Sequence, residues 1–289
     1  MIACDLCGAD NSRLILNSRR LDGPLVRCNS CGLSYVGLRQ SSLAFGSESP
    51  VAVADRVRRA NVSFPDLRLE EESRLARINA RSRLKLIRNY RQTGRLLEIG
   101  CARGDFLNIA RDFFDVHGVE PNPELAGAAS RVAPIHHDVV ETLSVGQFDV
   151  AASFHVIEHV DSPNRFLRAI VERVRVGGLV VIETPNIQSA PFNLMRSRWR
   201  QFIPEHYFFF NPGTLRRLLE SNGLRVEAIL NVGKYASLEL LLNRLSRYSG
   251  LFRPMGSVAR SVGLSRLTFH VNPRDIMFAV ATKLPVQQP

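Results

Sequence analysis

The sequence lacks the glycine-rich patterns by which α/β enzymes typically hold phosphate groups. No Gly-x-Gly-x-x-Gly opens a helix, and no Gly-Lys-Ser/Thr occurs. These absences argue against a dinucleotide-binding enzyme and against a phosphate-cradling loop. The chain also has no apolar run typical of a transmembrane helix or a signal peptide, so we expect a cytoplasmic location.

Acidic side chains are in the minority. The chain has 289 residues, with 38 Lys and Arg against 27 Asp and Glu, which gives a formal net charge of +11. Nearly all the basic residues are Arg, and most of the excess precedes residue 95. An anionic partner would suit this surplus, such as a nucleotide sugar, an acidic polymer, RNA or a phospholipid surface. A solvated basic face is the alternative interpretation.

Cysteine is rare, but four of the five cysteines form a pattern. Cys4 and Cys7 make one Cys-x-x-Cys-Gly turn, and Cys28 and Cys31 make a second. Two such turns have the spacing of a four-thiolate zinc site, and a reducing compartment disfavours disulfides. We expect a structural zinc ion, because four protein ligands leave no open position for catalysis. Cys101 lies elsewhere and is expected to be a small apolar residue.

The most informative segment covers residues 96–106, an apolar strand that runs into a turn of small residues. Gly100 and Gly104 allow a sharp turn and a close approach of the backbone to a ligand, and Asp105 begins a helix. Glu98 precedes the turn. A carboxylate there would repel a pyrophosphate but would attract an ammonium or sulfonium group.

Four further segments are predicted strands that alternate with helices: 116–120, 134–139, 148–155 and 177–184. This order predicts a doubly wound, largely parallel sheet whose ligand lies across the carboxyl ends of the strands.

These motifs resemble the cofactor half of class I S-adenosylmethionine-dependent methyltransferases over roughly residues 90–190. The resemblance implies an α/β fold with a doubly wound, seven-stranded Rossmann-like sheet, preceded here by a small zinc ribbon. It implies that Glu98 and the turn bind the methionine moiety, Glu120 the ribose, and Asp138 with Val139 the adenine. The implied cofactor-binding residues are Glu98, Gly100, Cys101, Ala102, Gly104, Glu120, Pro121, Asp138, Val139, Phe154 and His155.

The chain divides by composition into three parts. The expected parts are a zinc ribbon at 1–40, a linker and helix at 41–90, and the methyltransferase domain at 91–285. We expect residues 41–70 to be the linker and residues 71–91 to be the helix. Within the last part, residues 185–212 are rich in aromatic side chains and are expected to form a lid over the substrate, and residues 236–270 form an insertion.

The insertion separates two predicted strands, 224–232 and 276–282, which we expect to pair antiparallel at the edge of the sheet. Its residues 238–267 are rich in Leu and Arg and are amphipathic. This segment could contact a membrane surface, pack over the active site or form a dimer contact.

Candidate catalytic residues follow the fourth strand. His155, Glu158 and His159 lie there, and His206 lies in the expected lid. Transfer of a methyl group to a hydroxyl requires removal of a proton, for which histidine is well suited. A helix-capping role is the alternative for Glu158 and His159.

The same four residues suggest a second metal. They are similar to the Glu-x-x-Glu-His motif and later His by which some small-RNA and quinone O-methyltransferases hold a divalent ion. This chain departs from that motif by having His155 at its first position. The set would favour zinc, iron or manganese over magnesium.

The acceptor is the least determined feature. A four-cysteine ribbon before this core, with a Pro-Glu-His-Tyr segment, resembles bacterial methyltransferases that modify sugars of polysaccharides, lipopolysaccharide or natural products. We therefore expect O-methylation of a sugar or similar small acceptor, with an anionic sugar or glycolipid as partner. The alternatives are an RNA methyltransferase that binds through the basic ribbon, and a non-catalytic binding module. The acidic residues Glu98, Glu120 and Asp138 argue against the last alternative.

Overall fold

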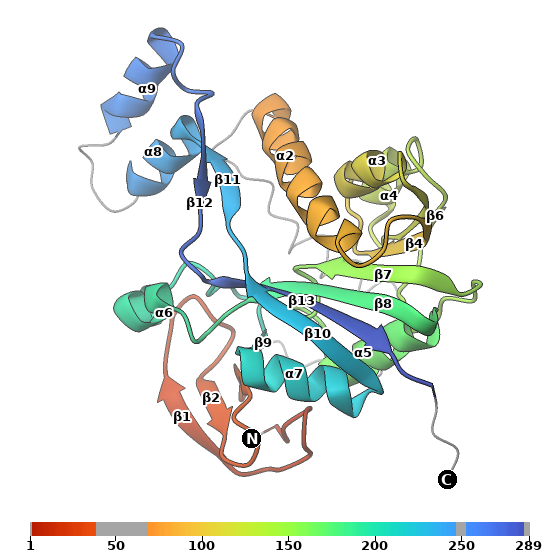
Figure 1. Ribbon diagram of the computed structural model, residues 1–289. Coiled ribbons are helices and arrows are strands. Elements are labelled where there is room, and N and C mark those ends of the chain that lie inside the picture. Colours follow the sequence, from red (N-terminus) through yellow and green to blue (C-terminus); the bar gives the residue numbers. More distant parts are fainter. Residues whose placement is uncertain (1, 39–68, 247–252, 286–289) are drawn as a thin grey trace.

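The computed structural model describes residues 2–38, 69–246 and 253–285. Its centre is a seven-stranded sheet in the order β10-β13-β8-β7-β4-β5-β6 (Figure 1). These strands are β10 (Leu224–Asn231), β13 (Ile276–Lys283), β8 (Val174–Pro185), β7 (Phe148–Phe154), β4 (Gly94–Ile99), β5 (Phe114–Val119) and β6 (Ile135–His136). All neighbours are parallel except β13, which is antiparallel to β8 and β10. The expected α/β, doubly wound, seven-stranded sheet is therefore confirmed.

Alternate residues of the central strands supply two hydrophobic cores. Leu96 of β4 packs with α2 and α3, whereas its neighbour Leu97 packs with α5 and α7 on the other face. Figure 1 shows α2, α3 and α4 above the sheet and α5 and α7 below it. These helices are α2 (Leu69–Arg88), α3 (Asp105–Ala110), α4 (Pro123–Ala129), α5 (Pro163–Glu172) and α7 (Pro212–Ser221). A sheet covered on both faces leaves the strand ends as the place for a ligand.

Two boundaries differ from the sequence-based expectation. The strand expected at 134–139 is only the two residues of β6, because the Asp138 carboxylate accepts hydrogen bonds from Val139 N and Thr142 Oγ1 and begins a turn. The helix expected at 71–91 ends earlier, at Arg88 of α2. Most of the expected linker at 41–70 falls within residues 39–68, outside the described residues.

The amino-terminal ribbon joins the main domain through a shared sheet. Its strands β1 (Ser12–Leu16), β2 (Leu25–Cys28) and β3 (Ser34–Val36) are followed in the sheet by β9 (Phe208–Phe209), which belongs to the segment after β8. The ribbon also caps α5, since Asn164 N donates to Asp5 Oδ2 at 2.8 Å. Residues far apart in the sequence thus form one unit.

The segment expected to be an aromatic lid forms a hydrophobic core instead. It contains α6 (Ala190–Met195), the short helix η1 (Arg196–Arg198) and β9. Trp199, Phe202 and Phe209 are fully buried and pack against Leu25 and Val36 of the ribbon. The burial of so much aromatic surface stabilises this junction and removes these rings from any substrate.

The insertion between β10 and β13 forms an arm that extends beside α2 (Figure 1). It consists of β11 (Lys234–Ser237), α8 (Leu238–Ser246), α9 (Arg253–Ser261) and β12 (Thr268–Val271), with β11 and β12 antiparallel. Exposed apolar side chains of the arm include Met255, Val258, Val262, Leu264, Leu267 and Phe269. Among the described helices, none is long and apolar enough to cross a membrane.

Candidate active site

A cleft of about 620 Å³ lies between the turn after β4 and the arm. The turn contributes Gly100, Cys101 and Ala102 to its lining, and the arm contributes Lys234 and Tyr235. Further lining residues come from α2, from the start of α4 and from the start of β13. This cleft is therefore at the strand ends, where the sequence predicted the cofactor.

The turn requires glycine at its first position. Gly100 has a φ of +76°, and a Cβ there would lie 2.5 Å from Val156 Cγ2. The amides of Gly100 and Cys101 both donate to Val119 O of β5, at 2.9 and 3.1 Å. Cys101 is buried beside the cleft, and burial raises the pKa of its thiol, so it is a small neutral residue there.

Glu98 is a buried acid without a partner for one of its oxygens. The residue is 5% exposed and lines the cleft, and no group in the described part of the chain bonds to its Oε2. Burial raises the pKa of Glu98 well above its usual value, despite the nearby Arg83 guanidinium. An orphaned carboxylate of this kind fits the ammonium group of the methionine moiety of S-adenosylmethionine.

Glu120 and Asp138 lie outside the lining of the cleft. Glu120 Oε2 accepts from Ala102 N and its Oε1 from Asn122 N, both at 2.9 Å, so this acid holds the turn in shape. Burial raises its pKa. Asn122, rather than Pro121, lines the cleft, and Val139 also lies outside it. The structure thus places Glu98, Gly100, Cys101, Ala102 and Phe154 at the cleft, and the assigned roles of Glu120, Pro121, Asp138 and Val139 stay predictions.

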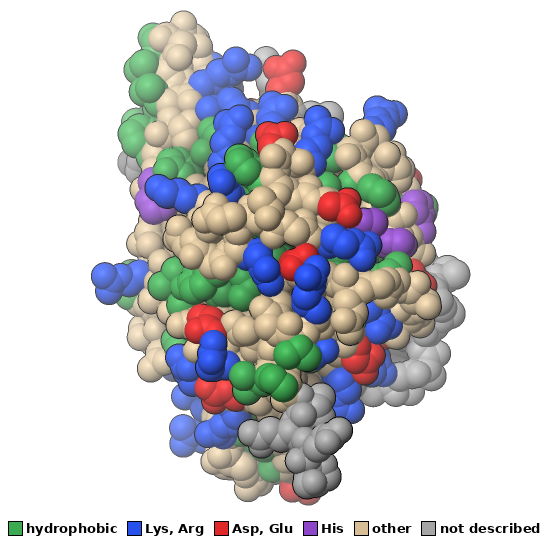
Figure 2. All heavy atoms as spheres, turned by 45° about the vertical axis from the view of Figure 1, so that its right-hand side comes forward, with side chains coloured by type: hydrophobic (Ala, Val, Ile, Leu, Met, Phe, Trp, Pro, Cys, Tyr) green, Lys and Arg blue, Asp and Glu red, His purple; other side chains and the backbone are tan. Residues whose placement is uncertain are grey.

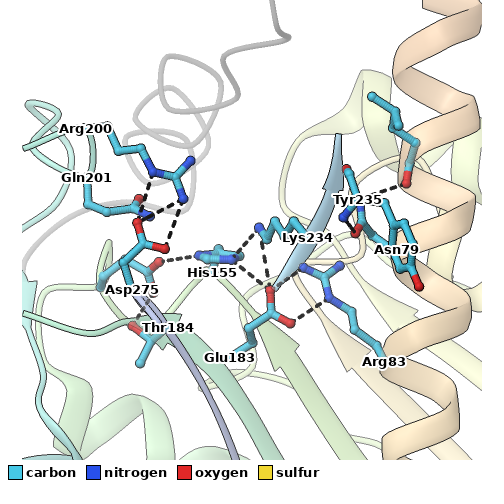
Figure 3. A network of polar contacts seen from close by, with 12 residues as sticks. Asn79, Arg83, His155, Glu183, Thr184, Arg200, Gln201, Lys234, Tyr235 and Asp275 are labelled. Atoms are coloured by element: carbon cyan, nitrogen blue, oxygen red, sulfur yellow. Dashed lines mark hydrogen bonds and ion pairs between the residues drawn. The ribbon is translucent and has the colours of Figure 1, made fainter. Parts of the chain in front are cut away.

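His155 follows β7 and lies at the centre of a polar network (Figure 3). Its φ of +59° is unusual for a residue other than glycine, and such strain is typical of functional sites. Its Nδ1 lies 3.0 Å from Glu158 Oε1, and because an ionised carboxylate only accepts, Nδ1–H donates. Its Nε2 lies 2.7 Å from Lys234 Nζ and 2.8 Å from Glu183 Oε1.

The two partners of Nε2 suit two protonation states of the imidazole. A neutral ring can accept a hydrogen bond from the Lys234 ammonium, and a protonated ring can donate to Glu183. Arg83 fixes that glutamate through two bonds, Nη2 to Oε1 at 2.6 Å and Nε to Oε2 at 2.9 Å. The ring can therefore gain a proton without leaving a buried polar atom unpaired.

The acids of this network are strongly held in the ionised form. Burial would raise the pKa of Glu158, but the bond from His155 and the charges of nearby imidazoles hold it at about 2. Burial would likewise raise the pKa of Glu183, which Arg83 holds well below its usual value. Burial lowers the pKa of Lys234 to about 8 even beside Glu183.

The four expected catalytic residues do not all converge on one candidate metal site. One ligand atom each from Glu158, His159 and His206 lies within 4.8 Å of the others, whereas His155 is outside this group. His159 Nδ1 donates to Glu205 O at 3.0 Å, and His206 Nδ1 has no partner in the described part of the chain. Burial lowers the pKa of His206 to about 3, with a further contribution from His159.

His206 is thus corrected from a lid residue to a buried one. It is 5% exposed and stacks edge-on against His159, with ring centroids 4.5 Å apart. His155, Glu158, His159 and His206 are all absent from the lining of the described cleft. Of the four, His155 is connected to that cleft through its contact with Lys234.

Sequence reasoning missed Glu183, Lys234 and Arg83. Glu183 could have been found, since it is an acid at the end of an apolar strand and pairs in register with Phe154 of β7. Lys234 lies 79 residues from His155 along the chain, and no local pattern marks it.

The four ribbon cysteines converge. Cys4 Sγ lies 3.4 Å from Cys31 Sγ, and Cys7 Sγ lies 3.5 Å from Cys28 Sγ. One sulfur from each residue lies within 4.8 Å of the others, and all four are unpaired thiols rather than disulfides. This donor set fits a zinc ion.

Comparison with known proteins agrees with this geometry. A family model described as a methyltransferase domain matches residues 71–229. A ubiquinone biosynthesis O-methyltransferase of Aeromonas salmonicida (strain A449) is 30% identical over 157 residues, which are 48% of this chain and 66% of the relative. Another, from Caulobacter sp. (strain K31), is 32% identical over 103 residues, 32% of this chain and 41% of the relative. The chain thus covers less than two thirds of the length of either relative.

Solved structures share the fold. A SAM-dependent methyltransferase from Archaeoglobus fulgidus has 22% identity and a TM-score of 0.51, with 74% of this chain and 97% of that chain covered. A Haloferax volcanii complex of the Trm112 methyltransferase activator and a putative methyltransferase gives 14% identity and a TM-score of 0.54, with 84% and 100% covered.

Proposed function

Because this chain belongs to the methyltransferase domain family, we propose that it is an S-adenosylmethionine-dependent methyltransferase that methylates a hydroxyl oxygen of a small, negatively charged acceptor. The bound donor supplies an electrophilic methyl group on a sulfonium. The observation that carries the proposal is the His155–Glu158 pair, with Nδ1 and Oε1 3.0 Å apart, beside the cleft.

In this proposal His155 is the general base. The bond to Glu158 fixes the proton on Nδ1, so Nε2 carries the lone pair that removes the proton of the acceptor hydroxyl. The hydroxyl takes the place of the Lys234 ammonium at Nε2. The proton then lies on Nε2, where Glu183 Oε1 accepts it in a hydrogen bond and stabilises the imidazolium.

The basic surplus of the whole chain supports an anionic acceptor. In the cleft itself five bases, Arg83, Arg103, Arg200, Lys234 and Arg244, are balanced by five acids, Glu72, Glu98, Asp105, Glu124 and Asp275. Figure 2 shows that Lys and Arg side chains are spread widely over the surface among fewer Asp and Glu side chains. A sugar or glycolipid that carries phosphate or carboxylate would meet this charge, and the relatives named for ubiquinone biosynthesis support oxygen as the methylated atom.

The test is a methyl-transfer screen with isotopically labelled S-adenosylmethionine and product mapping. Its arms are acidic sugars and glycolipids, phenols with adjacent hydroxyls, and RNA. We expect a methyl ether on a sugar or glycolipid. A methyl ether on a phenol would support methylation of oxygen but would contradict a sugar or glycolipid as the acceptor. Label only on nitrogen, on carbon or on RNA would contradict the proposal.

The proposal includes a structural zinc ion at Cys4, Cys7, Cys28 and Cys31. The ribbon is connected to the active site through the backbone: Val36 N donates to Tyr207 O, and Tyr207 N donates to Glu158 O, both at 2.9 Å. We therefore expect about one equivalent of zinc in the purified protein, and loss of both stability and activity on its chelation. Elemental analysis measures the zinc content, and Cys4→Ser, which removes one of the four sulfur ligands, is the control.

A second metal at Glu158, His159 and His206 stays a separate proposal. The convergence of three ligand atoms and the unpartnered His206 Nδ1 support it. The same elemental analysis tests it: a second equivalent that disappears in His206→Ala is expected, and a content unchanged by that substitution would refute it.

Peripheral membrane contact through the arm is a further part of the proposal. The exposed apolar residues on α9 and β12, together with the positive net charge, support contact with an anionic bilayer. Flotation with anionic vesicles at low salt should recover the protein, and Val258→Glu should reduce the recovery. No flotation of the unaltered protein would end the idea.

A further inference from the structure

A second hollow, of about 470 Å³, lies where the ribbon meets the segment after β8. β1, β2, α6 and η1 all contribute to it, and it shares no lining residue with the cleft described above. Its volume is within the range of about 300–1,000 Å³ that is typical of small-molecule sites. Nothing in the proposed methyl transfer uses it.

Three arginines converge on this hollow. Arg13 of β1 and Arg27 of β2 lie directly opposite each other in the antiparallel register, and Arg196 reaches the hollow from η1. Like charges at directly opposed strand positions are destabilising. The described lining contains no Asp or Glu that would offset them. Burial lowers the pKa of Arg27, and the charges of Arg13 and Arg196 lower it further.

Two of the guanidinium groups are held in place. Arg27 Nε donates to Ser34 Oγ at 3.3 Å, which directs its remaining donors elsewhere. Arg196 lies over the ring of Phe192, 5.4 Å from the ring centroid, and its φ of +47° is strained. Asn193 and Asn211 add neutral polar groups to the lining. Three cations, two of them held in place, together with neutral amide groups are typical of oxyanion recognition.

We propose that this hollow binds the phosphate or diphosphate group of a small molecule, through Arg13, Arg27 and Arg196. A phosphate monoester carries roughly −1.5 to −2 charge near neutral pH. One or two phosphoryl groups therefore match three guanidinium groups, and binding relieves their mutual repulsion. The site is independent of the proposed acceptor chemistry.

The test is calorimetric titration of the full chain at low salt with three probes: inorganic phosphate, pyrophosphate and uridine diphosphate. Saturating S-adenosylhomocysteine keeps the probes out of the cofactor cleft. Stronger binding of uridine diphosphate than of pyrophosphate would identify a nucleotide source, and equal binding would identify the phosphoryl group alone. Because hydrogen bonds to charged groups are strong, Arg27→Gln and Arg196→Gln should each weaken binding by about tenfold or more.

Arg225→Gln is the matched control, because Arg225 is exposed on β10 and pairs with Glu227. Its affinity for pyrophosphate should be unchanged. Without ligand, Arg27→Gln should melt no lower than the unaltered chain, since it removes repulsion. Pyrophosphate should raise the melting temperature of the unaltered chain but not that of Arg27→Gln.

Two results would overturn this proposal. They are no binding of any probe by the unaltered chain, and affinity for the probes unchanged in both arginine variants. Cofactor binding measured on the same samples separates these results from failure of the proposed methyl transfer.

Discussion

The carboxyl ends of β4 and β7 are neighbours in the sheet, yet the glutamates buried there have opposite surroundings. Glu98, 5% exposed, has an oxygen with no partner in the described residues, whereas Glu158, fully buried, bonds to His155 and to Thr184 Oγ1. The pKa of Glu98 is well above the usual value because of burial, and that of Glu158 is about 2 because hydrogen bonds and imidazole charges outweigh burial. Among the described residues, Glu98 therefore has a free acceptor oxygen for a bound cation, whereas both oxygens of Glu158 already accept hydrogen bonds within the protein.

The different surroundings of Glu98 and Glu158 suit the two acids to different roles, one in cofactor binding and the other in proton transfer. An unsatisfied acid gains most from a bound cation, and a satisfied acid keeps an imidazole in one tautomer. We therefore assign cofactor affinity to Glu98 and proton removal to His155 with Glu158 behind it. The following predictions test this division, from the largest expected effect to the smallest.

Replacing the base should have the largest effect. His155→Ala should lower kcat by about 10²–10⁴-fold, because general base catalysis contributes that much, and should leave the affinity for S-adenosylmethionine unchanged. His117→Ala is the control, since His117 on β5 contacts Asp115 and lies outside the cleft lining. Steady-state kinetics with calorimetry of the cofactor measures both quantities. A kcat within a few-fold of the unaltered enzyme would remove His155 from the chemistry.

Neutralising the unpartnered acid should mainly change affinity. Glu98→Gln should weaken S-adenosylmethionine binding by about 10–100-fold, because a charge-assisted contact to the ammonium is lost. The ligand-free variant should be no less stable, since an unpaired buried carboxylate has been removed. Calorimetric titration and urea denaturation give the two values. Unchanged affinity would show that the cofactor does not meet Glu98.

Replacing Glu158, whose two oxygens both accept hydrogen bonds, should mainly change stability. Glu158→Gln should lower the free energy of unfolding by about 1–3 kcal/mol, because the amide has one acceptor oxygen and cannot accept from both His155 and Thr184 as the carboxylate does. Its cofactor affinity should change little. Urea denaturation of Glu158→Gln and Glu98→Gln under the same conditions compares their free energies of unfolding. Equal losses of stability in the two variants would contradict the assigned roles.

The pH dependence of cofactor binding should be smaller but distinctive. Because the pKa of Glu98 is raised, protonation begins at higher pH than for an ordinary glutamate, and binding of a cation should weaken as the pH falls through that range. Affinity should therefore rise by a few-fold between about pH 5 and pH 8 and be flatter in Glu98→Gln. The same slope in both proteins would assign the dependence to another group.

Much of the cofactor half could be predicted from the sequence because its signals are local. Gly100 must have positive φ at a fixed place after an apolar strand, and Glu98 precedes it in the same strand. The aromatic run at 207–210 misled the prediction, since composition alone does not distinguish a lid from the core that Phe209 forms with the ribbon. Lys234 and the converging arginines depend on contacts between distant segments, which no local pattern encodes.

Single-turnover methyl transfer at saturating S-adenosylmethionine tests the division of roles most directly. The account predicts that saturation restores the rate of Glu98→Gln to near that of the unaltered enzyme and leaves His155→Ala slower by about 10²-fold or more. Recovery of His155→Ala at saturation, or no recovery of Glu98→Gln, would contradict it.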